Sequence, residues 1–539
     1  IDLTYRPSVD FYSDGRKQYF AIGSATKSAG QVFEDRYNSR IYNLDALAVV
    51  KPNIGDDFAG STLTVAHPMY RNRLDRIYAK GDNLVIPGFY DISNASSVVS
   101  GAYNGEYRLQ RGSVVADIAY KSMIYVGGSY TLEGNTTLPK DNSVYGYYGI
   151  NGSFVFSEMM NKSDVFSFGK IRASYGLVGL GAGQFYTTTP YNSLAFSDGW
   201  TDGITFPFNG IGGFDLSDVL GNSSLKPERR KQWEIGTDLR FFKNRLGLDL
   251  SYYHSKSFDV ILQVPVTSSS GYNNRNQNAA ELSNKGIEIV LTAAPVQTKN
   301  FSWNIQANFT KNENSVDALA DGVDQVFLGG FTGASTRAVV GQPYGTIFGF
   351  GFYKDASGKT VIGGDGFPVL DPNEKAFKSA LPDFQIGINN SVSWKGLTLS
   401  ALLDIKEGGY IWNGTRSAMY FFGTAYETGE LRGTKKVFEG NAAELDANGD
   451  VVLYDHDGDD KTPAIPKTTG ANTKEVAIGE GWLRTGNANG FFGNNTEDFV
   501  EDASWVRLRD VSLAWALPSS WLKKVRIQDA SISVSGRNL

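Results

Sequence analysis

The densest set of side chains that could bind a metal ion lies in one acidic segment of this chain. Its carboxylate and amide residues alternate along the chain: Asp446, Asn448, Asp450, Asp455, Asp457 and Asp459. Oxygen ligands at every second position are typical of the start of a calcium-binding loop, because Ca²⁺ takes several hard oxygen ligands from one curved backbone. The pattern is incomplete, since Val451 stands where such a loop has glycine and no glutamate closes it. A solvated external loop is therefore the alternative interpretation.

Aromatic residues in two long polar segments, 178–231 and 404–502, form a second candidate site. Flat aromatic faces stack on sugar rings and also pack against peptide side chains. The candidate substrate-binding residues are Tyr191, Trp200, Trp412, Tyr420 and Tyr426. The alternative is that these rings pack the loops against one another.

Catalytic chemistry has few residues to draw on. The chain has no cysteine and only three scattered histidines, His67, His254 and His456. This excludes thiol nucleophiles, zinc–thiolate sites and iron–sulfur clusters. The chain has neither a G-x-S-x-G motif nor a phosphate-binding G-x-x-x-x-G-K-[ST] loop. The adjacent Asp459 and Asp460 could suggest a glycosidase pair, but no strand end supports them. We therefore expect no enzyme and no resident cofactor, apart from calcium in the acidic loop.

Alternation of apolar and polar residues predicts the elements that position these loops. In Leu246–Tyr253 the leucines at 246, 248 and 250 share one face, and Asp249 lies on the other. Phe301–Thr310 alternates in the same way. Further strands are predicted at Leu3–Phe11, Val165–Tyr175, Trp233–Phe241, Ile287–Leu291, Phe384–Trp394, Leu397–Leu403 and Val525–Val534.

These runs are longer than the usual strand of about 5–6 residues and match the ~9–11 residues that cross a bilayer at a tilt. Aromatic residues near the run ends, such as Trp233, Phe309 and Trp394, are typical of interfacial girdles. A soluble all-β protein with half-buried strands is the alternative.

The composition agrees with a large β protein. A chain of 539 residues could form several domains or one very large barrel. The net charge of −6 gives no cationic footprint for nucleic acid. Glycine, at 61 residues, and aromatic residues, at 13%, suit extended, turn-rich structure.

Connections between the predicted strands differ greatly in length. Tight turns are predicted at 242–245, 395–396 and 110–112, and long polar connections at 178–231, 311–383 and 404–502. Outer-membrane barrels have short periplasmic turns and long extracellular loops. We therefore predict that the long connections are extracellular. Because no linker marks a boundary, we expect residues 1–539 to form a single, partial transmembrane β-barrel domain.

Several sequence motifs, in a fixed order, point to one family. They include N-x-x-L-K-x-E at 222–228, E-x-G at 234–236, N-K-G-x-E at 284–288, T-T-L-P at 136–139, P-D-F at 382–384, W-K-G at 394–396, G-G at 408–409, the stretch 503–513, L-P at 517–518 and G-R-N-L at 536–539. Together they resemble the SusC/RagA family of TonB-dependent outer-membrane transporters of Bacteroidetes.

The resemblance implies an all-β, antiparallel transmembrane barrel of about 22 strands, here incomplete. Family members carry a signal, a small β-sandwich domain, a TonB box and a plug before the barrel. Because Ile1 follows none of these, we expect an internal piece of a longer polypeptide.

The function implied by the resemblance is TonB-energised import of a bulky nutrient across the outer membrane of a Gram-negative bacterium. The nutrient would be an oligosaccharide or glycan, or an oligopeptide. The implied partners are TonB, through a plug absent from this sequence, and a SusD-like lipoprotein that caps the outer loops. The alternative is a passive porin or adhesin without energy coupling.

The alternation also predicts which side chains face lipid. A slip of one residue would move charge into hydrocarbon, so the register should be strict. Leu246, Leu248, Leu250, Ile287, Ile289, Phe301, Trp303 and Ile305 should face lipid, and Asp249, Glu288, Asn304 and Gln306 the lumen.

Overall fold

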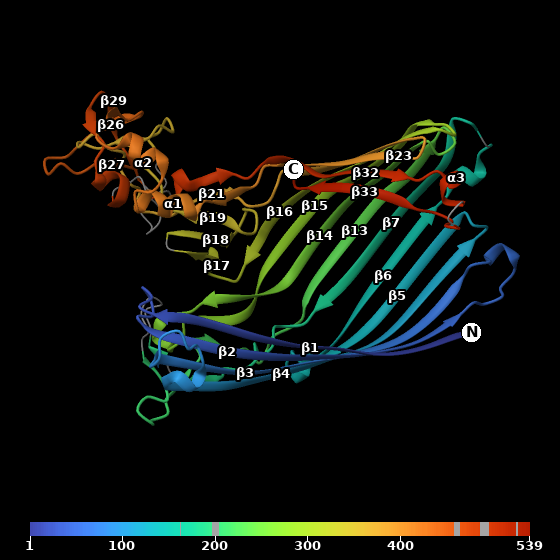
Figure 1. Cartoon of the computed structure of the whole chain (residues 1–539), viewed down its shortest axis with the longest axis horizontal. Helices are drawn as coiled ribbons and strands as arrows, with labels where there is room; N and C mark the ends of the chain where they lie inside the picture. The colour runs from blue at the N-terminus through green and yellow to red at the C-terminus, as the bar shows by residue number, and fades with distance from the viewer. Residues whose placement is uncertain are drawn as a thin grey trace. The chain divides into compact units, whose positions relative to one another are not determined.

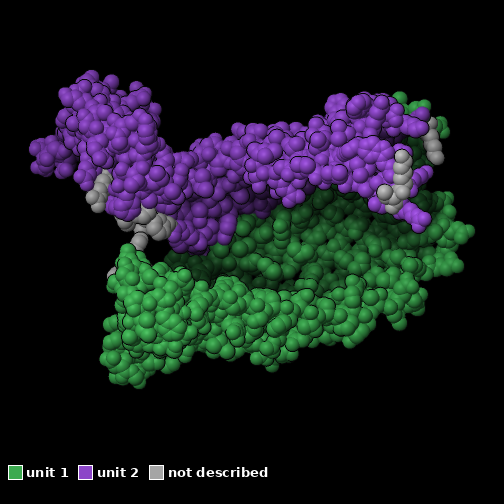
Figure 2. Space-filling model, viewed as in Figure 1, with its two compact units in different colours: residues 1–239, 253–282 green, residues 240–252, 283–539 purple. Residues whose placement is uncertain are grey.

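The computed structural model describes residues 1–161, 163–193, 195–196, 204–331, 333–456, 464–485, 495–523 and 526–539. Within them the chain divides into two compact units (Figure 2). Unit 1 comprises residues 1–239 and 253–282, and unit 2 comprises residues 240–252 and 283–539. The fold is all-β and mainly antiparallel, as predicted. Sixteen of the described strands belong to one sheet.

Unit 1 begins with seven strands that lie side by side in chain order, each antiparallel to the next (Figure 1). They are β1 (Asp2–Ile22), β2 (Ala29–Val50), β3 (Thr62–Leu84), β4 (Ala95–Tyr120), β5 (Ile124–Asn135), β6 (Val144–Phe154) and β7 (Phe166–Leu180). After β7 the sheet continues with β13 (Glu228–Phe241), β14 (Leu246–Pro265) and β15 (Asn274–Gln297), whose residues divide between the two units.

Five short strands lie between β7 and β13. They are β8 (Tyr191–Ser193), β9 (Ala195–Phe196), β10 (Ile204–Thr205), β11 (Phe214–Leu216) and β12 (Val219–Leu220). β12 pairs in parallel with β15, which ties this connection to the large sheet.

The sheet strands of unit 2 follow the same antiparallel order. After the second half of β15 come β16 (Phe301–Leu319), β22 (Phe384–Trp394), β23 (Leu397–Glu407), β32 (Trp505–Ala516) and β33 (Ser531–Arg537). In the register, Phe301 is opposite Trp394, and Trp394 is opposite Leu397. A bulge interrupts the pairing of β23 with β32 beside Leu402.

Turns and long connections lie at opposite ends of these strands. Lys395 and Gly396, both with positive φ (47° and 90°), close the turn between β22 and β23. Because β22 and β23 are antiparallel, the connections that precede 384 and follow 407 leave from the other end. Likewise, the 178–231 connection enters β13 at Glu228, whereas the 242–245 turn follows its other end. The turns at 242–245 and 395–396 therefore lie at the strand ends away from the long connections, and the extracellular placement of the long connections stays a prediction.

The long connections of unit 2 contain regular structure, although the sequence showed no pattern there. One small sheet has β17 (Gln325–Phe331), β18 (Ala334–Val339), β19 (Thr346–Gly349) and β21 (Lys375–Ser379). Another has β20 (Val361–Ile362), β26 (Asn441–Ala443) and β29 (Thr468–Ala471). The remaining elements are β24 (Tyr410–Trp412), α1 (Gly414–Phe421), α2 (Tyr426–Leu431), β25 (Lys435–Val437), β27 (Leu453–Tyr454), β28 (Ile465–Pro466), β30 (Glu475–Ala477) and β31 (Val500–Asp502). In Figure 1, α1, α2, β26, β27 and β29 gather together at one end of unit 2. We use the name outer body for the described residues of 352–371 and 410–502, which include these elements.

Two sequence predictions about strands are wrong. Residues 110–112 are not a turn but lie inside β4, paired with 132–134 of β5, where Arg111 forms an ion pair with Glu133. The run Val525–Val534 begins too early, because Pro518 starts the short helix α3 (Ser519–Leu522) and β33 begins only at Ser531. Residues 524–525 lie outside the described part of the chain.

Candidate functional site

The sheet of unit 2 has two chemically different faces. On one face the register groups apolar residues: Phe301, Trp303, Ile305, Ala307 and Phe309 of β16, Ile386, Ile388 and Val392 of β22, Leu397, Leu399, Leu403 and Ile405 of β23, and Leu513 and Trp515 of β32. On the other face it groups Asn304, Gln306, Asn308, Gln385, Asn389, Ser391, Thr398, Ser400 and Asp404. The predicted split of β16 into two faces is therefore observed, whereas the lipid and lumen assignments stay predictions.

The apolar face is partly exposed on β16 and exposed on β22, β23 and β32 near the turn at 395–396. Trp394 is 56% exposed, Leu399 50% and Leu513 46%. A contiguous exposed apolar face of this kind requires a cover, such as bilayer hydrocarbon or another protein. Aromatic residues lie at both ends of the band, with Trp394 at the turn and the stacked Phe309 and Phe384 at the other end. This spacing is typical of a membrane-crossing strand.

One polar residue, Asn390, interrupts the apolar face. Its register partners are Ile305 on β16 and Ala401 on β23. The indole Nε1–H of Trp303 donates a hydrogen bond of 2.8 Å to Asn390 Oδ1. Trp303 therefore compensates part of the cost of an amide in an apolar surface.

Unit 1 shows the same division. Val114 of β4, Tyr130 of β5 and Tyr148 of β6 follow one another in the register and are 47%, 52% and 45% exposed. On the opposite face Glu133 is buried and accepts hydrogen bonds from Arg111 and from the hydroxyl of Tyr145. Polar groups thus satisfy one another on one face, while apolar groups are left uncovered on the other.

The motif at 222–228 fixes the connection before β13 to the neighbouring strands. Leu225 is fully buried in a cluster with Leu138 and Ala182. The Asn222 side-chain amide donates to the carbonyl of Asn276 in β15 at 2.9 Å, and its oxygen accepts from the amide of Ser224 at 2.9 Å. This segment therefore holds the connection before β13 against the large sheet.

The same motif compensates an irregularity in β14. Asp259 has φ of 57°, a left-handed conformation that is uncommon within a strand, although aspartate tolerates it better than most residues. Nearby, the amide of Ile261 donates to Glu228 Oε1 at 2.8 Å. Asn278 Nδ2 donates to the carbonyls of Asp259 and Lys226, at 2.8 and 2.9 Å. The Glu228 carboxylate and the Asn278 amide thus form hydrogen bonds with backbone groups beside the irregular residue Asp259.

The predicted substrate-binding residues divide between the units. Tyr191 lies on β8 of unit 1, opposite Leu216, and is 73% exposed. Trp200 lies outside the described residues. Trp412, Tyr420 and Tyr426 belong to the outer body of unit 2. The structure therefore brings three of the five predicted residues into one region.

Trp412 and Tyr420 lie at opposite ends of α1. A side chain at Gly414 would meet the Trp412 ring at 2.6 Å, so only glycine allows this start of the helix. Arg416 reaches from α1 to Glu501 at 3.0 Å and lies over the rings of Tyr420 and Phe499, at 5.3 and 5.7 Å. Tyr420 therefore has a packing role, in agreement with the alternative interpretation of the aromatic residues.

Two clefts flank the C-terminal end of α1 and share Phe422. One, of about 370 Å³, is lined by Tyr420, Phe421, Phe422, Arg432, Glu480 and Leu483. The other, of about 420 Å³, is lined by Trp412, Ala418, Met419 and Phe422, among others. Phe422 and Tyr426 are prominently exposed. These rings are available for contact with a ligand or a partner.

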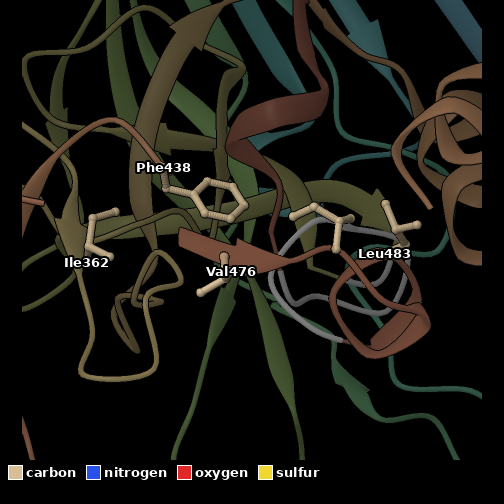
Figure 3. Close-up of a cluster of buried hydrophobic side chains, with 5 residues drawn as sticks. Ile362, Phe438, Val476 and Leu483 are labelled. Atoms are coloured by element: carbon tan, nitrogen blue, oxygen red, sulfur yellow. The ribbon is translucent and has the colours of Figure 1, made fainter. Parts of the chain in front are cut away.

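The outer body has its own apolar core (Figure 3). Ile362, Phe438, Val476 and Leu483 come from segments far apart in the sequence and are buried together with Ile478. The Trp482 ring lies 5.0 Å from that of Phe367 and 4.9 Å from that of Phe438. The long connections therefore fold together as a packed structure.

Asp355 joins three segments of the outer body. Its carboxylate accepts hydrogen bonds from Ser357, from Asn441 Nδ2 at 2.7 Å and from Thr468 Oγ1 at 3.3 Å. Burial alone would raise its pKa, but the hydrogen bonds from Ser357, Asn441 and the Lys359 amide outweigh this and lower the pKa to about 2. Residues 355–358 form a turn, with Gly358 at φ 78° and its amide donating to the Asp355 carbonyl at 2.8 Å.

The acidic segment begins with a hydrogen-bonded turn. Asp446 accepts hydrogen bonds from the amides of Asn448 and Asp450, at 2.8 and 2.9 Å. Asp457 and Asp459 lie outside the described residues. Among the described residues, Asp446, Asp450 and Asp455 included, no group of three or more His, Asp or Glu side chains is placed to hold a metal ion. Calcium binding by Asp446, Asn448, Asp450 and Asp455 stays a prediction.

Sequence reasoning missed the ion pair of Arg416 with Glu501 and the buried Asp355. Both lie in connections without alternation, and each contacts residues far away along the chain. An N-cap signal was present at Asn413, whose side chain accepts from the Arg416 amide at 2.9 Å.

Among the described helices, none combines the length and the apolar character needed to cross a bilayer.

Comparison with known proteins decides the family. Residues 3–539 match the TonB dependent receptor-like, beta-barrel family. The chain belongs to this family. The predicted resemblance to SusC/RagA transporters is confirmed by the relatives and the structures that match.

Curated relatives carry the same family description. TonB-dependent receptor P3 of Formosa agariphila is 27% identical over 435 residues, which cover 76% of this chain and 38% of P3. SusC of Bacteroides thetaiotaomicron is 24% identical over 206 residues, which cover 35% of this chain and 20% of SusC. The chain spans 38% of the length of P3 and 44% of that of receptor P26.

Solved structures match along the whole chain. The structure of the RagAB peptide transporter has a TM-score of 0.72 and 19% identity, over 100% of this chain and 56% of that one. The 'open-open' state of the RagAB peptide importer has a TM-score of 0.71 and 20% identity, over 100% and 55%. At this identity the likeness shows the fold.

Proposed function

We propose that this chain is the C-terminal part of the barrel of a TonB-dependent transporter that imports a bulky nutrient across the outer membrane of a Gram-negative bacterium. The observation that carries the proposal is the two-faced sheet, with an exposed apolar face and a hydrogen-bonding face. Such strands suit a wall with lipid on one side and a wet path on the other. Membership of the receptor family supports the same function.

The polar face suits a large solute with many hydrogen-bonding groups. Asn304, Gln306, Asn389 and Ser391 supply donors and acceptors along neighbouring strands. Hydroxyl-rich oligosaccharides or glycans and amide-rich oligopeptides are both solutes of this kind. The RagAB neighbour is described as a peptide transporter, which makes peptides one of the two substrate classes to test.

Energy coupling is the part of the proposal that separates it from a passive porin or adhesin. The decisive measurement is uptake of labelled oligosaccharide and oligopeptide mixtures by cells that carry the full-length protein. Uptake should stop when TonB is deleted and return when TonB is restored. Uptake that is unchanged without TonB would establish the passive alternative, and the class of solute lost would identify the substrate.

A SusD-like surface lipoprotein is the proposed partner at the outer body. Ile411, Met419, Phe422 and Tyr426 are exposed apolar residues around α1, a composition typical of interface cores. A capping partner should bury at least the ~1,600 Å² of a standard interface.

The partner proposal is tested with the double variant Met419→Asp and Phe422→Asp. Purification through the full-length protein should then lose the lipoprotein, because two charges would enter the interface core. Leu453→Asp in β27 is the matched control, since Leu453 is also an exposed apolar residue of the outer body. If the double variant and the control recover equal amounts of lipoprotein, these residues do not form the contact.

A further inference from the structure

On the exposed apolar face of unit 1, hydrophobic residues give way to arginine at one level of three neighbouring strands. Val65 of β3 is opposite Ala48 of β2 and Val114 of β4. Farther along the same face, Arg71 is opposite Tyr42 of β2 and Arg108 of β4. Alternate residues of a strand share a face, so Val65 and Arg71 point to the same side.

The basic residues at this level form two ion-paired groups that are neighbours in the register, where Arg73 is opposite Glu106. We call them together the arginine patch: Arg40, Arg71, Arg73 and Arg108 with Asp75 and Glu106. Glu106 lies between Arg71 at 2.7 Å and Arg108 at 2.6 Å. Asp75 lies between Arg73 at 3.1 Å and Arg40 at 3.9 Å. Four guanidinium groups thus share two carboxylates.

The charge that faces outward is positive. The four arginine side chains are 41–57% exposed, whereas those of Asp75 and Glu106 are 17% and 28% exposed. Four guanidinium groups against two carboxylates leave the patch with two positive charges in excess. Like charges held together in this way repel one another unless an anion joins them.

The position of the patch indicates which anion it meets. Along β2 the apolar Leu44 is followed on the same face by Tyr42, 40% exposed, and then by Arg40. The Tyr42 ring lies 5.8 Å from the Arg71 guanidinium. On β13 the same order occurs: Ile235 and Trp233 are exposed, and beyond them Arg229 and Lys231 lie over Phe258. Apolar, aromatic and then basic residues follow one another, as they do where a protein passes from hydrocarbon to headgroups.

We propose that the arginine patch binds the phosphate groups of anionic lipid headgroups at the outer edge of the apolar band. Planar guanidinium groups bind phosphate oxygens in pairs, and Arg40, Arg71, Arg73 and Arg108 supply more donors than two carboxylates use. The inference rests on the proposed function only in that the chain must span a membrane. It adds a lipid-binding site separate from the substrate path.

The test uses the full-length protein in nanodiscs of phosphatidylcholine, with and without lipid A as the phosphate-bearing lipid. Native mass spectrometry counts the lipid A molecules that stay bound as detergent is added. The triple variant Arg71→Gln, Arg73→Gln and Arg108→Gln should bind lipid A roughly a hundredfold more weakly, at about fivefold per arginine. Arg230→Gln is the control, because Arg230 lies on the opposite face of β13 beside Gln232; it should bind like the wild type.

Equal retention of lipid A by the triple variant and the wild type would overturn the proposal. Displacement of lipid A by millimolar inorganic phosphate would also overturn it, since the patch would then be a site for free phosphate. Lysine at the same three positions keeps the charge and should give intermediate retention of lipid A. The lysine variant therefore still tests the proposal if the glutamine variant fails to fold. Failure of the wild-type protein to insert into phosphatidylcholine alone would count against the proposed function instead.

Discussion

Leu138 and Leu225 meet in one buried cluster of unit 1, each from a different sequence motif. Leu138 belongs to T-T-L-P in the turn between β5 and β6, and Leu225 to N-x-x-L-K-x-E before β13. Asn142, in the same turn as Leu138, donates to the Leu225 carbonyl at 2.9 Å. Both motifs therefore act together, holding the connection before β13 against the strand ends.

Leu225→Ala should loosen this connection. Removing a fully buried leucine side chain costs about 2–5 kcal/mol, because the cavity closes only in part. The expected result is faster hydrogen exchange at the amides of Asn222 and Ser224, with the exchange of β5 and β6 unchanged. Leu180→Ala is the control, since Leu180 is 64% exposed in the same unit. Equal exchange in both variants would show that Leu225 does not hold the loop.

Asp355 should make the outer body sensitive to acid. Its pKa lies at about 2 in the folded protein, below its ordinary value of 3.8. A lowered pKa gives stability that is fully present above about pH 4 and is lost as the pH falls toward 2, in total roughly 2 kcal/mol. Asp355→Asn should remove this dependence, measured as the exchange rate of the Asn441 amide between pH 5 and pH 2. Asp365→Asn, at an exposed turn carboxylate, should leave it intact.

Prediction from the sequence worked best where a strand alternates strictly between apolar and polar residues and ends at a clear turn. The predicted run Phe384–Trp394 coincides with β22, because its alternation ends at Lys395 and Gly396, whose φ angles suit a tight turn. It failed at 110–112, where glycine beside charged residues resembled a turn. There the deciding contact, Arg111 with Glu133, comes from the next strand and cannot be seen within a short window.

The outer body was beyond prediction for a related reason. Its core joins Ile362, Phe438 and Val476, and its polar links join Asp355 to Asn441 and Thr468. Apart from α1, its elements are only two to six residues long, so neither a helical nor a strand period can develop. Aromatic content marked the region as important, but the same rings serve packing, as the contact of Tyr420 with Phe499 at 5.5 Å shows.

Trp303 and Asn390 give a test of hydrogen bonding on the apolar face. Trp303→Phe keeps an aromatic ring but leaves the Asn390 amide without its indole donor, which should cost about 1–3 kcal/mol in lipid. Asn390→Leu should restore stability in the Trp303→Phe background, because the face is then wholly apolar. The measurement is urea unfolding from vesicles by tryptophan fluorescence. If Trp303→Phe destabilises the protein equally with Asn390 intact and in the Asn390→Leu background, the hydrogen bond does not contribute to stability.

Arginine substitutions on facing strands test which side of the sheet meets hydrocarbon. Leu403 of β23 lies on the apolar face near the middle of the band, and Asn389 of β22 lies at a similar depth on the polar face. Leu403→Arg should destabilise the protein in vesicles by roughly 2–4 kcal/mol, the cost of a basic residue at mid-depth. Asn389→Arg should change stability little, because its side chain would remain in water. If Asn389→Arg is the more damaging substitution, the lipid and lumen assignments of Leu246, Trp303 and Asn304 must be exchanged.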